Sequence, residues 1–307
     1  MKSLENLRKL GMGLKQMAYG YVAHPMTRHA PLRIALNMVG WQLRSRLARG
    51  NHHVRWISGT SLLVHSGMTG ATGNIYYGLA EFHDMAFVLH LLRPRDLFVD
   101  IGANVGAYSV LAGGVCGADV IAIEPIPATA EKLNANIILN DLRAQVEVIE
   151  ACIGDSEGSV RMTCDLDTTN RVISPAEAPA KSQVEVPMRR LDLALQGRLP
   201  VFIKIDTEGF EGSVLRGSQE VLRSPGLLGV SVEGNGSNAY PGLEGKTIPD
   251  WMGQFGFTLV SYDGSSRVLS TDPSSYPMHN LLFVRNLEEC KQRVASAKSV
   301  EILGIPV

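Results

Sequence analysis

Short apolar runs recur along the chain from Leu97 onward, and segments with helical spacing separate several of them. Runs of this length that are rich in Val and Ile predict strands. Between residues 129 and 140, Leu133, Ile137 and Ile138 share one face of a predicted helix. Near-continuous apolar strands separated by helices are typical of a parallel sheet covered on both sides, so the pattern predicts an α/β fold. The predicted strands are 97–101, 119–124, 145–151, 201–206, 227–233, 257–262 and 280–285.

Two regions depart from this alternation. The segment from about 155 to 200 is longer than an ordinary crossover, and we interpret it as an insertion with two extra strands, 158–165 and 182–191. Before the sheet, residues 81–92 predict a helix and residues 56–77 predict loops or short strands. The first 50 residues have an amphipathic helical pattern interrupted at Pro25 and Pro31. We therefore divide the chain into a helical N-terminal extension, 1–55, and a main domain, 56–307.

Charge sets the extension apart from the main domain. Residues 1–55 contain ten Lys and Arg residues and one acid, Glu5, which gives +9, and the net charge of −1 leaves −10 for the remainder. The extension could therefore contact anionic lipid, an acidic partner, or the acidic surface of the main domain. The alternative is that its helices are simply solvated and dock on nothing. Basic residues do not alternate with aromatic residues in the main domain, so we expect no nucleic-acid partner.

The remaining composition favours a cytoplasmic globular protein. The four cysteines lie far apart without a C-x-x-C pair, which argues for reduced thiols and against a zinc module. The uncharged runs 56–80 and 101–118 contain many Gly, Ser, Thr or Asn residues, so neither predicts a membrane-spanning helix. The N-terminus lacks the apolar core and cleavage site of a signal peptide. We expect a cytoplasmic protein, with peripheral membrane contact as an option.

The first predicted strand leads into the sequence VDIGANVG, an acid followed by glycines four residues apart. In an open parallel sheet, ligands bind beyond the carboxyl ends of the strands, where Asp100, Gly102 and Gly106 would lie. The fingerprint of a dinucleotide-binding loop would read G-x-G-x-x-G. An acid at the loop entrance would repel the phosphates of a dinucleotide. It would attract a cation, so the motif fits S-adenosylmethionine better than NAD. The alternative is a tight turn with no ligand.

The next two strand ends carry suitable chemistry for the rest of such a donor. Glu124 ends the second strand, where a carboxylate can accept hydrogen bonds from both ribose hydroxyls. After the third strand, Asp155 could bind an adenine amino group, and the region of Ile153 could cover the ring. An ordinary Gly-Asp turn is the alternative for Asp155. Three consecutive strand ends of this kind favour a donor site.

Together the segments VDIGANVGAYS, IEPIPATAEKLNANIILN, IGDSEG, RRLDLAL and IKIDTEGFEGSVLRG resemble the FkbM-type S-adenosylmethionine-dependent methyltransferases. The resemblance spans 81–284 and implies a class I, Rossmann-like methyltransferase fold, whose seven-stranded sheet has an antiparallel last strand. It also implies methyl transfer to a hydroxyl oxygen, often on a sugar or a polyketide. The implied donor residues are Asp100, Gly102, Asn104 and Gly106 for the methionine part, Glu124 for the ribose and Asp155 for the adenine.

The fourth strand, VFIKID, points to the reacting end of the site. Alternation places Phe202, Lys204 and Asp206 on one face and Ile203 and Ile205 on the other. A lysine inside a sheet needs a partner, and either Asp206 or Glu208 can provide it. A structural ion pair is the alternative to a catalytic one.

A hydroxyl acceptor must lose its proton when it attacks the methyl group. The candidate proton acceptors are Asp206 and Glu208, with Lys204 holding the cluster in place, and Glu233 approaches the same region. A weaker alternative is one Mg²⁺ held by Asp206, Glu233 and Asn235.

The favoured function is therefore O-methylation of a small-molecule, glycan or lipid-linked acceptor such as a sugar, a glycolipid or a secondary metabolite. An NAD-dependent oxidoreductase and a non-catalytic module that binds an adenosine ligand are the alternatives.

Overall fold

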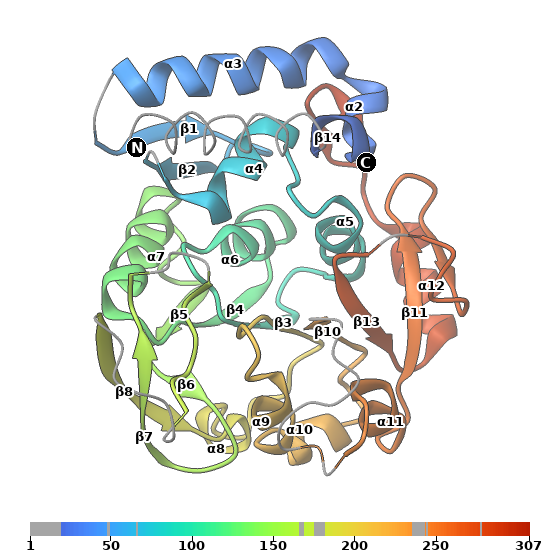
Figure 1. Ribbon diagram of the computed structural model, residues 1–307. Coiled ribbons are helices and arrows are strands. Elements are labelled where there is room, and N and C mark those ends of the chain that lie inside the picture. Colours follow the sequence, from blue (N-terminus) through green and yellow to red (C-terminus); the bar gives the residue numbers. More distant parts are fainter. Residues whose placement is uncertain are drawn as a thin grey trace.

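The computed structural model of the chain describes residues 20–47, 50–65, 67–165, 169–174, 182–234, 243, 245–276 and 278–307 (Figure 1). Its centre is an eight-stranded sheet. The seven predicted strands are all present, and the last of them is antiparallel to its neighbours as expected. The sheet also has an edge strand that was not predicted, β12, which pairs with β11 as a hairpin. In spatial order the strands are β12 (Val268–Ser270), β11 (Thr258–Asp263), β13 (Asn280–Val284), β10 (Gly229–Glu233), β9 (Phe202–Ile205), β3 (Leu97–Ile101), β4 (Asp119–Ile123) and β5 (Val146–Ile149).

Strand order fixes where a ligand can bind. From β3 the chain adds β4 and β5 on one side, then returns to add β9 and β10 on the other side of β3. The direction of winding therefore reverses between β3 and β9. Loops diverge at such a reversal and leave a crevice at the carboxyl ends of the strands.

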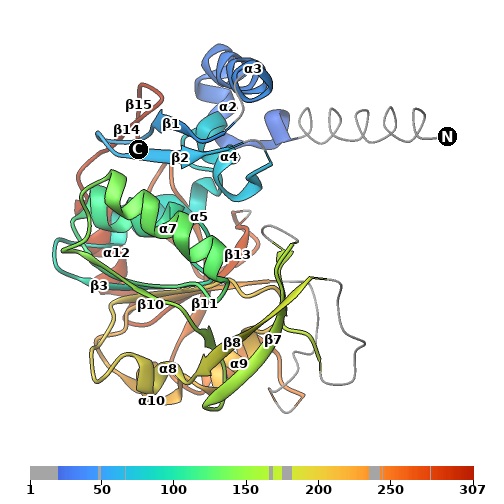
Figure 2. The same cartoon turned by 90° about the vertical axis from the view of Figure 1, so that its left-hand side faces the viewer.

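Alternation along the strands builds two cores, and Figure 2 shows helices above and below the sheet. Phe98 and Phe202 belong to one core, whereas Val99 and Ile203 belong to the other, as predicted for β9. The first core includes residues of α5 (Phe82–Leu91), α6 (Ala107–Val110), the π-helix η1 (Leu111–Cys116), α7 (Pro127–Leu139) and α12 (Leu287–Ser296). The second includes residues of α8 (Leu191–Ala194), α9 (Glu211–Arg216), α10 (Gln219–Arg223) and α11 (Ile248–Gly253).

Helix α7 differs in one detail from its predicted buried face. Leu133 and Ile137 are buried, but Ile138 is 51% exposed. One residue advances a helix by about 100°, so Ile138 is turned away from the core that Ile137 enters. The prediction for Ile138 was therefore wrong.

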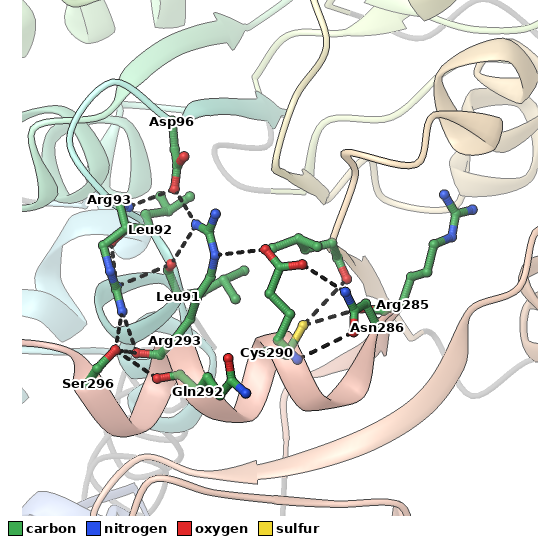
Figure 3. Close-up of polar contacts among 12 residues, drawn as sticks. Leu91, Leu92, Arg93, Asp96, Arg285, Asn286, Cys290, Gln292, Arg293 and Ser296 are labelled. Carbon is green, nitrogen blue, oxygen red and sulfur yellow. Dashed lines mark hydrogen bonds and ion pairs between the residues drawn. The ribbon is translucent and has the colours of Figure 1, made fainter.

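Polar contacts attach α12 to the start of the sheet (Figure 3). The Arg293 guanidinium donates to Asp96 Oδ2 at 2.6 Å, just before β3. Arg93 donates to the carbonyl oxygen of Arg293 and to Ser296 Oγ. Asn286 begins the helix by accepting a hydrogen bond from the Glu289 backbone. These contacts are remote from the carboxyl ends of the strands and are structural.

The N-terminal part lies on the side of the sheet that α5, α6 and α7 cover. It contains α2 (Pro25–His29), α3 (Pro31–Leu47), β1 (His52–Arg55), β2 (Ser61–Val64) and α4 (Thr69–Tyr77). The prediction of loops or short strands for 56–77 was wrong for α4, whose two glycines and two threonines lower its helix propensity. Tertiary packing against α3 and β2 compensates. None of the described helices has both the length and the apolar character needed to cross a membrane.

The insertion forms a separate small sheet of order β6-β8-β7. Its strands are β6 (Cys152–Ile153), β7 (Gly158–Thr163) and β8 (Gln183–Arg189), and the last two match the predicted pair. Most of the Ala- and Pro-rich segment between β7 and β8 lies outside the described residues. A final hairpin, β14 (Glu301–Ile302) and β15 (Ile305–Pro306), ends the chain beside α4 and α3.

Candidate active site

The glycine loop after β3, residues 102–106, turns sharply and is hydrogen-bonded to the end of β4. Three of its residues have positive φ, namely Gly102 (76°), Asn104 (51°) and Gly106 (89°). The N–H groups of Gly102 and Ala103 donate to the carbonyl oxygen of Ile123 at 2.9 and 3.0 Å. Gly102 and Asn104 line a pocket, whereas Gly106 packs beneath it against Leu133. Gly106 therefore shapes the loop without lining the pocket.

The pocket encloses about 380 Å³ at the carboxyl ends of β3, β4 and β9. Two predicted donor residues, Asp100 and Glu124, are buried in its wall. Glu124 accepts hydrogen bonds from the Asn104 N–H at 3.0 Å and the Ile126 N–H at 2.9 Å. Burial nevertheless raises the pKa of Glu124 to about 7. Asp100 accepts from Ser109 Oγ at 2.6 Å, and burial also raises the pKa of Asp100.

Carboxyl groups outnumber basic groups in the described lining of this pocket. It contains six carboxylates and one lysine, namely Glu81, Asp100, Glu124, Asp206, Glu208 and Glu233 with Lys204. Such a lining disfavours phosphates and favours a ligand that carries positive charge. The sulfonium and ammonium groups of S-adenosylmethionine fit this chemistry.

One part of the pocket is apolar and suits a flat ring. Ile153 lies there, as predicted, and the insertion adds Met162 and Val172. Ile123, Ile126, Cys152 and Phe210 are among the other apolar residues of the lining. The insertion therefore contributes directly to the wall of the pocket.

Lys204 lies between Asp100 and the carboxylates at the ends of β9 and β10. It lies opposite Asp100 in the register of β9 and β3, and its Nζ is 2.6 Å from Asp206 Oδ2. Its ammonium group also lies 4.8 Å from the centre of the Tyr108 ring. Burial alone would lower the pKa of Lys204, but attraction to Asp206 and Asp100 outweighs it and raises that pKa. The lysine is therefore a fixed cation inside the sheet.

Three carboxylates meet at the ends of β9 and β10. The nearest oxygens of Asp206, Glu208 and Glu233 all lie within 4.8 Å of one another. Burial opposes ionisation of Asp206, but Lys204 outweighs this effect and lowers the pKa of Asp206. Burial, followed by the charge of Asp206, raises the pKa of Glu233 to about 8 and also raises the pKa of Glu208. The cluster therefore contains one firmly ionised carboxylate and two that hold a proton more readily.

Some residues of the site had no signal in the sequence pattern. Tyr108 donates from its hydroxyl to Glu81 Oε2 at 2.6 Å, and Asn280 donates to the same oxygen at 3.2 Å. Glu81 and Asn280 are far apart in the chain, and no local spacing links them. Ser109, which donates to Asp100, is the last residue of the motif VDIGANVGAYS, but the sequence pattern gave it no role.

Comparison with known proteins identifies the family. Residues 100–259 match the model of the methyltransferase FkbM domain. The chain belongs to the FkbM methyltransferase family. It is 29% identical over 186 residues to the 31-O-demethyl-FK506 methyltransferase FkbM of Streptomyces tacrolimicus, covering 55% of this chain and 68% of that protein. It is 26% identical over 172 residues to the methyltransferase sdnD of Sordaria araneosa, covering 45% of this chain and 66% of that protein.

Solved structures give only a weak likeness. The S-adenosylmethionine-dependent methyltransferase from Agrobacterium tumefaciens is 12% identical, with a TM-score of 0.41 over 77% of this chain and 70% of that one. The putative transferase PH0793 from Pyrococcus horikoshii is 15% identical, with a TM-score of 0.38 over 83% of this chain and 82% of that one. The class I fold of this FkbM methyltransferase is therefore assigned from the strand order of its own sheet.

The structure places one predicted donor residue, Asp155, outside the pocket lining. Asp155 is turned toward α9, where its carboxylate pairs with Arg216 and its N–H donates to Ser213 Oγ at 3.3 Å. It is absent from the pocket lining, so this structure gives no support to the adenine contact predicted for it. The close approach of Gly217 to the Gly154 carbonyl holds this turn against α9. Asn235, the predicted metal ligand, lies outside the described residues.

The carboxylate cluster of this FkbM methyltransferase fits a metal only in part. Oxygen ligands suit Mg²⁺, and Asp206, Glu208 and Glu233 are close enough together to share one ion. However, the Lys204 ammonium already neutralises Asp206, and a divalent cation would have to lie close to that positive charge. Lys204 therefore already provides the positive charge beside Asp206 that a metal ion would provide.

Proposed function

We propose that this FkbM methyltransferase transfers the methyl group of S-adenosylmethionine to a hydroxyl oxygen of an uncharged, hydroxyl-rich acceptor. The observation that carries the proposal is the carboxylate cluster at the ends of β9 and β10, beside the donor end of the pocket. A hydroxyl is a weak nucleophile until a base takes its proton, and carboxylates are suitable bases. The named activity of the relative from Streptomyces tacrolimicus, a 31-O-demethyl-FK506 methyltransferase, agrees with an oxygen acceptor.

Glu208 is the proposed general base. Its pKa is raised by burial and by the charge of Asp206, which makes its carboxylate a better proton acceptor than an ordinary one. Asp206 is a weaker base because Lys204 holds it ionised. As the acceptor oxygen bonds to the methyl carbon and the carbon–sulfur bond breaks, the hydroxyl proton passes to Glu208. Glu208 has a φ of 50°, a strained conformation that is common at functional sites.

The other members of the cluster hold Glu208 in place. The Glu208 N–H donates to Glu233 Oε2 at 3.2 Å. The buried Glu211 fixes the backbone on both sides of Glu208. Its Oε1 accepts hydrogen bonds from the Thr207 and Gly209 N–H groups at 3.2 and 3.0 Å. These contacts make Glu233 and Glu211 positioning residues.

The charge of the pocket also limits the acceptor. With several carboxylates around the reacting end, a phosphorylated or carboxylated acceptor would be repelled. Sugars, glycolipids with neutral head groups and hydroxylated secondary metabolites satisfy this limit. We therefore expect neutral acceptors to react better than their phosphorylated counterparts.

Donor binding provides the first test. Titration calorimetry should show heat with S-adenosylmethionine and none with NAD. Glu124→Gln keeps the side-chain shape but removes the charge proposed to bind ribose, so donor affinity should fall about 10- to 100-fold. Glu131→Gln, on the exposed face of α7, is the matched control and should leave affinity unchanged. Heat with NAD alone would contradict the donor assignment.

Donor binding should also depend on pH. Because the pKa of Glu124 is about 7, its carboxyl is mainly protonated below that pH and ionised above it. Ribose hydroxyls donate to the ionised form, so donor affinity should be constant above about pH 8 and fall by up to tenfold per pH unit below 7. Calorimetry from pH 5.5 to 8.5 measures this profile. If Glu124→Gln shows the same profile as the wild type, another group controls binding.

A further inference from the structure

The outward face of α3 carries an apolar stripe. Its members are Leu32, Leu36, Val39, Leu43 and Leu47, which are 80%, 71%, 58%, 56% and 84% exposed. Their spacing of three or four residues places them in one row along the helix. Figures 1 and 2 show α3 as the outermost element on its side of the molecule, with β1, β2 and α4 between it and the sheet. The stripe therefore faces away from the protein over the full length of the helix.

The opposite face of α3 is packed, so the orientation of the stripe is fixed. Ile34, Met38 and Trp41 are buried in the main core. Gln42 Nε2 donates to the Tyr76 hydroxyl at 2.8 Å, and Asn37 donates to the Tyr76 carbonyl at 3.3 Å. Rotating the helix to bury the stripe would expose the core residues and break both hydrogen bonds.

Arginines border the stripe. At about 100° per residue, Arg33 and Arg44 lie along one side of the row and Arg46 along the other. All three are exposed. The sequence between Glu5 and Glu81 contains no acidic residue, and Glu301 of β14 lines the same hollow as Arg33. The helix thus presents an apolar row with cationic borders, the pattern of helices that lie in a membrane interface.

We propose that α3 docks this protein on an anionic membrane surface, with the apolar stripe in the acyl boundary and the arginines at the lipid phosphates. Charge complementarity favours lipid over a second copy of the chain. Two α3 faces brought together would place arginines from both copies near one another, and α3 itself contributes no acid to offset them. A lipid surface supplies both the apolar layer and the negative charge.

Vesicle co-sedimentation of the full chain tests the proposal. Wild-type protein should pellet with phosphatidylcholine vesicles that contain 30% phosphatidylglycerol and much less with phosphatidylcholine alone. Leu36→Gln/Leu43→Gln should weaken binding at least tenfold, because it removes apolar area from the middle of the stripe. Leu193→Gln/Leu199→Gln is the matched control, since both leucines are exposed elsewhere, and it should bind as the wild type does.

Substitution of the arginines is a second test of the proposal. Arg33→Gln/Arg44→Gln should lower affinity for the anionic vesicles by about fivefold for each arginine, and added salt should lower wild-type binding in the same way. Calorimetric binding of S-adenosylmethionine and the circular dichroism spectrum should be unchanged in all variants, which separates docking from folding and from the donor site.

Three outcomes would overturn the proposal. The first is a wild type that pellets with neither kind of vesicle. The second is a stripe variant that binds as tightly as the wild type, which would place the contact in residues 1–19 or elsewhere. The third is a wild-type dimer in light scattering that the stripe variant converts to a monomer without any vesicle binding, which would make a second copy the occupant.

Discussion

Glu208→Gln should lower methyl transfer by about 10²- to 10⁴-fold at saturating donor, because the variant cannot accept the acceptor hydroxyl proton. Asp206→Asn should also lower turnover, since it leaves the buried Lys204 ammonium without its partner at 2.6 Å. Donor affinity should stay near the wild-type value, because the proposed donor residues lie at the ends of β3 and β4. Steady-state kinetics with labelled donor, on an acceptor found by screening neutral glycans and lipid extracts, measures turnover, and calorimetry measures donor binding.

Separate controls distinguish the base from a metal site and from a structural cluster. Glu131→Gln should keep full activity. A chelator should leave the rate unchanged, because Lys204 and not a metal is proposed to balance Asp206. Loss of activity on chelation with recovery on added Mg²⁺ would make the three carboxylates metal ligands. Full turnover in both the Asp206 and the Glu208 variant would show that the base lies elsewhere.

Gly102→Ala should destabilise the protein by about 3–5 kcal/mol or prevent its folding. Gly102 has a φ of 76°, and a Cβ atom there would lie 1.8 Å from the carbonyl oxygen of Asp206. The left-handed conformation costs an L-residue about 1–2 kcal/mol, and displacement of the β9 end adds a packing cost of similar or larger size. Urea unfolding followed by circular dichroism gives the free energy of unfolding of each variant.

Gly59→Ala isolates the effect of the close approach. Gly59 has a φ of 86°, but a Cβ atom there would meet nothing within 4 Å. This variant should therefore show only the backbone cost, about 1–2 kcal/mol. Equal losses in the two variants would show that contact between the glycine loop and the end of β9 contributes little. A larger loss in Gly102→Ala would show that this contact couples the donor loop to the proposed catalytic strand.

The sequence alone determined seven strands of the described sheet and the edge of the sheet at which the pocket lies. Val- and Ile-rich runs of strand length specify their own conformation, and alternation assigns each side chain to a face, as in Phe202 and Ile203. The loop after β3 and Glu124 could be placed beside each other because parallel strands bring their carboxyl ends to one edge. A partner for Lys204 was also predicted, either Asp206 or Glu208, since a buried lysine in a strand needs an acid within reach, and the structure shows that it is Asp206.

Only the tertiary structure decided the features that depend on contacts between distant segments. Asp155 was expected at the pocket but pairs with Arg216, because the close approach of Gly217 turns its loop toward α9. Helix α4 forms despite a poor helical sequence, because packing stabilises a short helix more than propensity does.

The sequence likewise did not determine which face of α3 packs against the core. An amphipathic pattern shows that α3 has different faces, but not which one meets the core. Both candidate faces are apolar, and the choice was made by the residues that α3 packs against, Tyr76 among them, far along the chain. Glu81, Tyr108 and Asn280 meet for the same reason, since contacts across the fold leave no periodic signal in any local stretch of sequence.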